Sequence, residues 1–213
     1  MIISNQRRAM EIAASVLTGL GKILFVDILE MKFAFILAAC LFWIGYIIFR
    51  YRQDPLIMSY WGLTRKNFSE VFRMFLPYAL GCVILFVTYG LISDTLIVNW
   101  HIVPIMLLYP LWGVIQQYLV VGLVAGNLDD YGKRKIPKWL IVILTAILFS
   151  VVHFPSPLLI GGTFLLALVY TIVYLKKRNL LVLGLYHGWL GGLFYFFVLN
   201  RDPFEEVFMQ ITG

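Results

Sequence analysis

The chain has 213 residues, of which 62% are hydrophobic and 13% are charged, and its mean hydropathy is +0.89. Because about a quarter of the residues in soluble domains are charged and about half are apolar, this composition excludes an ordinary soluble domain. The formal net charge is +6, but the basic residues gather in short clusters between apolar runs. Such clusters are typical of the loops of membrane proteins, and they argue against nucleic acid as a partner.

Apolar runs follow one another along the whole chain. Since a helical span needs about 20 apolar residues, they predict about seven transmembrane helices. The first run contains Lys22 and Asp27 and has no clear small-residue cleavage site, so we expect a span rather than a cleaved signal. The seven runs cover residues 12–29, 33–49, 72–92, 103–124, 139–154, 158–175 and 180–199. The predicted fold is all-α, a polytopic helical bundle that forms a single membrane domain over residues 1–213.

Local patterns add detail to this bundle. Asn67 with Glu70 three residues later is a capping-box pattern, which predicts a helix that begins at the membrane surface and continues into the third span. Cys40 and Cys82 lie inside apolar runs, so they indicate neither a disulfide nor a metal site. Glycines at four-residue spacing predict close contact between helices: Gly122 with Gly126, and Gly184 with Gly188 and Gly192.

Basic residues occupy alternate loops and therefore predict the orientation in the membrane, because such loops stay on the cytoplasmic side. The clusters are Arg7 and Arg8; Arg50, Arg52, Arg65, Lys66 and Arg73; Lys133, Arg134, Lys135 and Lys138; and Lys176, Lys177 and Arg178. With seven spans, the N-terminus is expected in the cytoplasm and the C-terminus outside. We expect an integral protein of a bacterial plasma membrane.

Few polar residues lie deep in the predicted spans. They are Gln116 and Gln117 in the fourth span, His153 at the end of the fifth and His187 in the seventh. At about 1.5 Å per residue their depths are comparable, roughly 13 to 22 Å, so Gln116, His153 and His187 could meet near the midplane. Each of them could instead be an interhelical hydrogen-bond partner that contributes about 1 kcal/mol. Both interpretations remain open at this point.

The order of these residues resembles the CPBP family of intramembrane proteases, which includes CAAX prenyl endopeptidases and bacteriocin-processing or self-immunity proteins. The resemblance covers about residues 61–197, and the Trp61-Gly62-Leu63 segment also looks similar. In the family, Glu-Glu-x-x-x-Arg supplies a water-activating glutamate and Phe-x-x-x-His supplies a partner histidine. A His-x-x-x-Asn or Asp motif supplies a second histidine and a side chain that stabilises the oxyanion.

This sequence keeps part of the pattern that the resemblance implies. Phe149, His153 and His187 match the family motifs, whereas Gln116 and Gln117 replace the two glutamates. Val121 stands at the arginine position and Gly191 at the final Asn or Asp position, so these two residues and Phe149 are expected to line the site. A carboxamide does not take up a proton near neutral pH, so Gln116 can orient water but cannot be its general base.

The departures are consistent with one another. Loss of only one partner of a buried Glu-Arg pair would leave an isolated charge, and here both are replaced. Two histidines without a carboxylate make a poor catalytic zinc site, so neither a metal nor another cofactor is expected. We predict a degenerate, neutral version of the protease site at Gln116, Gln117, His153 and His187.

Two functions follow from this interpretation. The first is a non-catalytic protein, or pseudoenzyme, that binds a membrane-anchored, prenylated or bacteriocin-like peptide without cleaving it, as an immunity, scaffold or sorting factor. The second is an active intramembrane endopeptidase, a hydrolase in which His153 or His187 is the base and Gln116 orients the water. We favour the first, because the catalytic carboxylate is missing. A transporter is disfavoured, because paired short broken helices are not evident.

Overall fold

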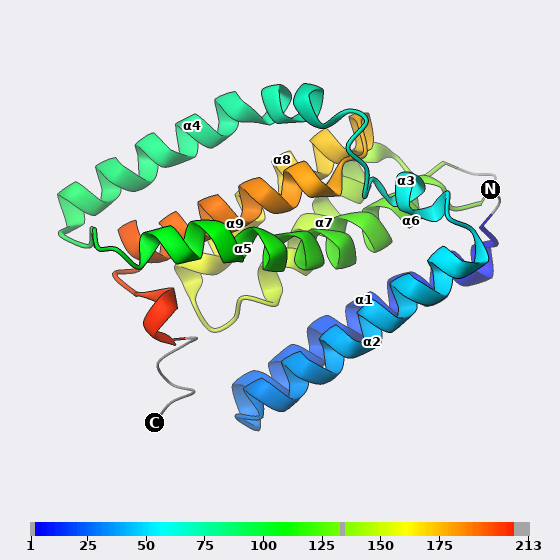
Figure 1. Ribbon diagram of the computed structural model, residues 1–213, viewed down its shortest axis with the longest axis horizontal. Helices are drawn as coiled ribbons and strands as arrows, with labels where there is room; N and C mark the ends of the chain where they lie inside the picture. Colours follow the sequence, from blue (N-terminus) through cyan, green and yellow to red (C-terminus); the bar gives the residue numbers. More distant parts are fainter. Residues whose placement is uncertain (1–2, 133–134, 207–213) are drawn as a thin grey trace. The chain divides into compact units, whose positions relative to one another are not determined.

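The fold is known from a computed structural model that describes residues 3–132 and 135–206. In these residues every regular element is helical and there is no strand (Figure 1). The elements are α1 (Asn5–Gly21), the π-helical η1 (Lys22–Ile28), α2 (Lys32–Gln53), α3 (Ile57–Trp61), α4 (Phe68–Ser93), α5 (Ile102–Gln117), the π-helical η2 (Tyr118–Ala125), α6 (Gly126–Asp129), α7 (Lys138–Val151), α8 (Pro157–Lys176) and α9 (Leu180–Phe197).

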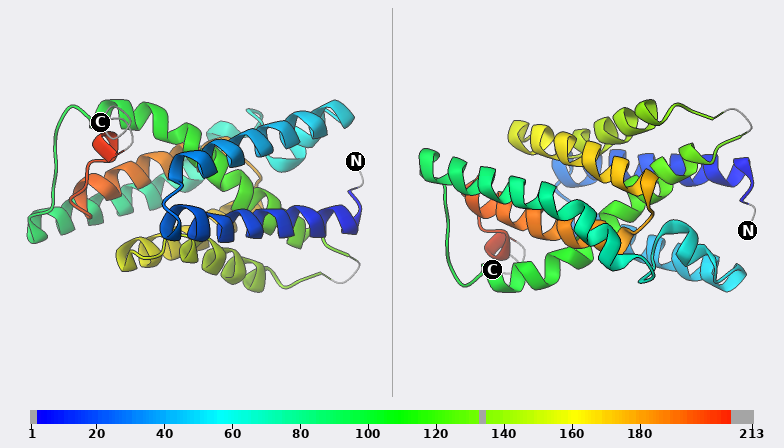
Figure 2. Two further views of the ribbon diagram at one scale, coloured as in Figure 1. Left: turned by 90° about the horizontal axis from the view of Figure 1, so that it is seen from below. Right: turned by 90° about the horizontal axis from the view of Figure 1, so that it is seen from above.

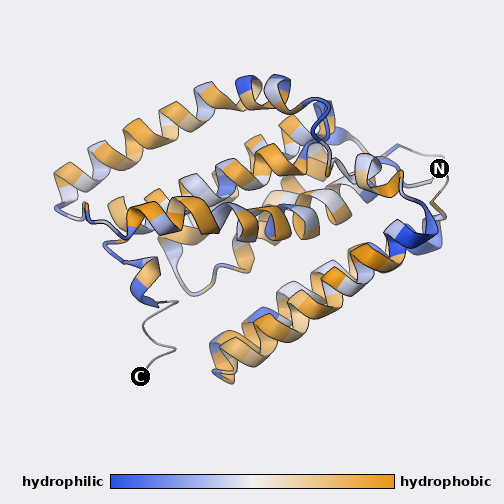
Figure 3. Ribbon diagram, in the orientation of Figure 1, coloured by the Kyte–Doolittle hydropathy of each residue, from blue (hydrophilic) through white to orange (hydrophobic). Residues whose placement is uncertain are grey.

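Six helical stretches among the described residues are long and apolar enough to cross a membrane. They are Asn5–Ile28, Phe33–Gln53, Phe68–Ser93, Ile102–Asp129, Pro157–Lys176 and Leu180–Phe197, and each contains or overlaps a predicted apolar run. Hydrophobic residues run along these helices, and hydrophilic residues gather at helix ends and in connections (Figure 3). The protein is therefore an integral membrane protein with the predicted all-α, polytopic fold.

The remaining predicted span corresponds to α7, which has only 14 residues. Antiparallel α7 and α8 lie side by side (Figure 2). Arg178, just after α8, lies 2.9 Å from Asp130, just after α6, so α8 ends at the level where α6 ends. Because α8 is about 30 Å long, its start lies near the opposite membrane surface. We infer that α7 and the turn at residues 152–156 carry the chain across, which makes seven crossings.

The described chain divides into two compact units. Unit 1 contains the residues up to Thr64 together with Tyr118–Arg178, and unit 2 contains Arg65–Gln117 together with the residues from Asn179 onward. Unit 1 thus holds α1, η1, α2, α3, η2, α6, α7 and α8, and unit 2 holds α4, α5 and α9.

A buried ion pair joins three helices of unit 1. Glu11 of α1 lies 2.6 Å from Arg50 of α2, and their side chains are 2% and 6% exposed. Tyr46 also donates to Glu11, and Asn127 of α6 donates to its second carboxylate oxygen at 2.7 Å. Because removing one partner of a buried pair costs about 3 to 5 kcal/mol, these helices are strongly coupled.

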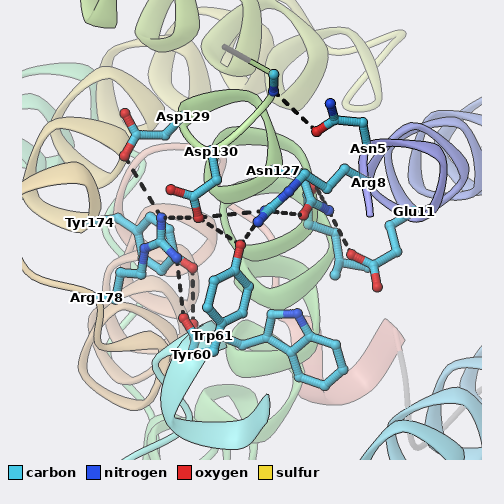
Figure 4. A network of polar contacts seen from close by, with 12 residues as sticks. Asn5, Arg8, Glu11, Tyr60, Trp61, Asn127, Asp129, Asp130, Tyr174 and Arg178 are labelled. Atoms are coloured by element: carbon cyan, nitrogen blue, oxygen red, sulfur yellow. Dashed lines mark hydrogen bonds and ion pairs between the residues drawn. The ribbon is translucent and has the colours of Figure 1, made fainter. Parts of the chain in front are cut away.

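A second polar network connects the ends of helices in unit 1 (Figure 4). The Asp130 carboxylate accepts hydrogen bonds from Tyr60 at 2.6 Å and from Arg178 at 2.9 Å, and it also pairs with Arg8. Burial alone would raise the pKa of Asp130, but the hydrogen bonds from Tyr60 and Arg178 outweigh burial and lower it. Asp130 therefore stays ionised and connects α1, α3 and the end of α8.

The predicted glycine contacts are found in unit 2, where the backbones of α5 and α9 meet. A Cβ atom added at Gly184 would lie 2.5 Å from the backbone nitrogen of Val114, and one at Gly188 would lie 2.3 Å from that of Pro110. Gly113 faces the carbonyl oxygen of Gly184 in the same way, at 2.2 Å. Only glycine permits this approach, so the spacing of Gly184 and Gly188 correctly indicated close packing. A Cβ atom at Gly126 would instead lie 3.1 Å from the hydroxyl of Tyr174.

The capping-box prediction is right about where the helix begins and wrong about the bond. Helix α4 begins at Phe68 and continues into the third span, but the side chain of Asn67 makes no capping hydrogen bond. Its Oδ1 atom instead accepts a hydrogen bond from Nδ2 of Asn179 at 2.7 Å. Asn67 therefore bonds to a residue 112 positions away along the chain and not to the backbone of its own helix.

We predict that Gly188→Ala destabilises the protein by about 1 to 3 kcal/mol or more, because its Cβ would collide with backbone atoms that cannot move aside. Gly191→Ala is the matched control, because it lies in the same helix and its Cβ would meet nothing within 4 Å. Denaturant unfolding of the purified protein in detergent measures both variants. Equal stability of the two would contradict the backbone contact.

Candidate functional site

Gln116 and His187 form a hydrogen-bonded pair in unit 2. Nε2 of the His187 ring lies 2.6 Å from Oε1 of Gln116. Because an amide oxygen can only accept, Nε2 carries the proton and the lone pair of the neutral ring is on Nδ1. Gln116 follows Gly113 by three residues and His187 follows Gly184 by three, so the glycine contact of α5 with α9 brings the two side chains within bonding distance.

Gln117 differs from its neighbour. Its side chain is fully buried, and neither Oε1 nor Nε2 has a hydrogen-bond partner among the described residues. An unsatisfied buried polar group costs about 1 to 3 kcal/mol, so such a residue calls for an explanation. A carboxamide offers both a donor and an acceptor, which are the groups that a water molecule or a peptide bond can satisfy.

The helix changes its winding immediately after the glutamine pair. Helix α5 ends at Gln117, and π-helical η2 runs from Tyr118 to Ala125. Hydrogen bonds in a π-helix run to the fifth residue, and such segments occur frequently at functional sites. The residue that lies one turn after Gln117 is therefore not the residue that a regular α-helix would place there. Val121, at the position of the family's arginine, is buried in this segment at 1% exposure.

Gly191 lies one helical turn after His187 in α9. A Cβ atom added there would meet nothing within 4 Å. The residue that corresponds to the family's Asn or Asp therefore has room for a side chain, and the absence of one is not imposed by packing. Gly191 differs in this respect from Gly184 and Gly188.

His153 lies in unit 1 and is held by its own helix turn. Its Nδ1 atom lies 2.7 Å from the carbonyl oxygen of Phe149, so Nδ1 carries the proton and Nε2 holds the lone pair of the neutral ring. The two aromatic rings pack edge to face with their centroids 5.0 Å apart. Phe149 is buried, and it therefore orients His153 both through its carbonyl and through its ring.

The structure thus brings together Gln116 with His187, and Phe149 with His153. These two pairs belong to different compact units, so the meeting of His153 with the Gln116–His187 pair remains a prediction. Glu11 is a buried carboxylate in unit 1, and it interacts with Arg50, Tyr46 and Asn127. Its place immediately before the first apolar run, residues 12–29, was the sequence signal that could have revealed it.

One group of side chains in unit 2 has a geometry that could hold a metal ion: His101, Asp202 and Glu205, whose ligand atoms lie within 4.8 Å of one another. Sequence analysis did not find it. Oδ2 of Asp202 already contacts His101 at 2.6 Å and accepts from Asn99 at 2.9 Å. Burial raises the pKa of Asp202, but these hydrogen bonds and backbone N–H groups outweigh burial and lower it. The contacts of Asn99 and His101 with Asp202 connect the segment before α5 to the segment after α9.

We predict that Gln116 and His153 lie close enough to share one ligand. Cysteines introduced as Gln116→Cys and His153→Cys, with Cys40 and Cys82 replaced by serine, should be joined by a short bifunctional thiol reagent. The control pairs Gln116→Cys with Val151→Cys, because Val151 is 47% exposed in the same part of the chain. Gel mobility after proteolysis measures the cross-link. Failure of the first pair, or equal linking of both, would contradict convergence.

Comparison with known proteins agrees with the motif order. Residues 98–193 match the family described as type II CAAX prenyl endopeptidase Rce1-like, within the predicted range of residues 61–197. No curated protein and no solved structure matches the chain. The matched segment carries Gln116, Gln117, His153 and His187, so the part of the chain that holds the candidate site residues is similar to the Rce1-like CAAX endopeptidase family.

Proposed function

We propose that the protein is a non-catalytic member of this family, which binds a membrane-embedded or lipidated peptide at the family's substrate site and does not cleave it. The observation that carries the proposal is the glutamine pair at the positions of the catalytic glutamates. Gln116 accepts a hydrogen bond from His187, and neither residue of the pair offers a carboxylate that could take a proton from water.

Gln117 supports a binding role. Its unpartnered Oε1 and Nε2 atoms are complementary to the N–H and C=O groups of a peptide bond. Inside a membrane a peptide bond outside regular structure has no water to pair with, so satisfying it is favourable for both partners. The partner that fits is a membrane-anchored, prenylated or bacteriocin-like peptide, and the protein would act on it as an immunity, scaffold or sorting factor.

An active endopeptidase is the second candidate, and the histidine tautomers favour it. The lone pairs on Nδ1 of His187 and on Nε2 of His153 can each accept a proton. In that mechanism one imidazole takes the proton of the attacking water, while Gln116 positions the water or the scissile carbonyl. Gly191 supplies no side chain for the oxyanion, and one missing donor costs about 3 to 4 kcal/mol in the transition state.

Cleavage assays distinguish the two candidates. The wild-type protein is reconstituted with a library of membrane-anchored peptides, and products are identified by mass spectrometry. We expect bound but uncleaved peptides, because a general base of sufficient strength is missing. Cleavage that is lost in His153→Ala or His187→Ala would contradict the non-catalytic proposal. Cleavage that survives replacement of both histidines would contradict both candidates.

The same assay tests why activity is absent. Gln116→Glu alone should create little activity, whereas Gln116→Glu combined with Gly191→Asn supplies both a base and an oxyanion donor. The open space at Gly191 accommodates the asparagine. The matched control combines Gln116→Glu with Gly191→Ala, which fills the same space without a hydrogen-bonding group. Equal activity of the two double variants would show that the oxyanion argument is wrong.

We also propose that the N-terminus lies in the cytoplasm and the C-terminus outside, in a bacterial plasma membrane. The alternation of basic loops and the seven crossings inferred above support this orientation. A reporter active only in the cytoplasm should work when fused before residue 5 and fail when fused after Gly213. Cytoplasmic activity of the second fusion would contradict either the orientation or the crossing by α7.

A further inference from the structure

A groove runs along the surface of unit 1 between α7 and α8. Its volume is about 360 Å³, and its floor is formed by Val142 and Ile143 of α7 and by Ile172 of α8. No polar side chain interrupts this floor, so its chemistry suits an acyl chain rather than a polar ligand. This groove involves none of the residues of the candidate peptide site.

Two lysines stand at one end of the groove. Lys138 begins α7 and Lys176 ends α8, and both line the groove because the two helices are antiparallel. Both side chains are exposed, and neither ammonium has an acidic partner in the part of the chain that the structure describes. Arg178, two residues beyond α8, is instead neutralised by Asp129 and Asp130. The end of the groove therefore carries two uncompensated positive charges.

Trp139 marks the depth of this end in the membrane. Its side chain lines the groove and is 65% exposed. Tryptophan is enriched at the level of the lipid headgroups, where its ring is apolar and its N–H group is hydrated. The lysines beside it therefore lie where a phospholipid phosphate lies, with the apolar floor extending toward the acyl chains.

We propose that this groove binds one anionic phospholipid, with its headgroup between Lys138 and Lys176 and an acyl chain over Val142, Ile143 and Ile172. Charge complementarity selects the occupant, because a zwitterionic lipid brings its own cation to the two lysines. Basic pockets between transmembrane helices recognise anionic headgroups in this way. The lipid would stabilise the α7–α8 pair, which contains the short fifth predicted span.

Native mass spectrometry of the full chain, released from bilayers that contain phosphatidylcholine and phosphatidylglycerol, tests the proposal. We expect selective retention of one phosphatidylglycerol. Since each lysine near the surface contributes about fivefold to anionic lipid binding, Lys138→Gln with Lys176→Gln should lower the affinity roughly 30-fold. Retention of phosphatidylcholine should be unchanged. Equal retention of both lipids by the wild-type protein would overturn the proposal.

The matched control is Arg52→Gln with Lys135→Gln, which removes two positive charges that do not line the groove. It should lower the affinity much less than the loss of Lys138 and Lys176 does, because neither residue lines the groove or can contact a headgroup held between the two lysines. Ile172→Trp fills the groove without changing charge and should also displace the lipid. Equal loss in both double variants would indicate general attraction and overturn the specific site, as would displacement by soluble glycerol phosphate.

Discussion

The close approach of the α5 and α9 backbones at Gly113, Gly184 and Gly188 is the constraint on which the candidate site depends. Helices in a membrane gain little from apolar burial, because lipid is as apolar as their side chains. Helix association in a membrane is instead stabilised by van der Waals contact between glycine-lined surfaces and by interhelical hydrogen bonds. The Gln116–His187 bond lies one turn from the glycine contact, so packing and polar pairing act at the same point of the helix pair.

In unit 1 the helices are held together by ion pairs and by hydrogen bonds to carboxylates. Its buried Glu11 is satisfied by Arg50, Tyr46 and Asn127, and Asp130 is satisfied by Tyr60, Arg8 and Arg178. Each acid is surrounded by donors because an unpaired charge in an apolar interior costs several kcal/mol. Gln117 of unit 2 has no partner for either polar atom of its carboxamide among the described residues, so a ligand that pairs with both atoms would lower the energy of the site.

Similarity to the family and catalytic activity are separate questions for this protein. The segment that matches the family retains the two histidines and the phenylalanine that orients one of them. The two glutamates, the arginine and the Asn or Asp of the family pattern are replaced by Gln116, Gln117, Val121 and Gly191. Binding requires shape and hydrogen-bonding groups, whereas hydrolysis also requires a group that changes its protonation state. A site without a carboxylate can therefore still bind a peptide but lose the ability to hydrolyse it.

The all-α membrane fold, the positions of the spans and the four-residue spacings of Phe149 with His153 and of the α9 glycines could be predicted from the sequence, because apolar length and helical period are local properties. The sequence also gave the helix start at Phe68, but not the partner of Asn67. The pairing of Glu11 with Arg50 and the room at Gly191 depend on residues that are distant in the chain and meet only after folding. Tertiary structure decided these features, since a polar group in a membrane is satisfied by whichever partner packing brings within reach.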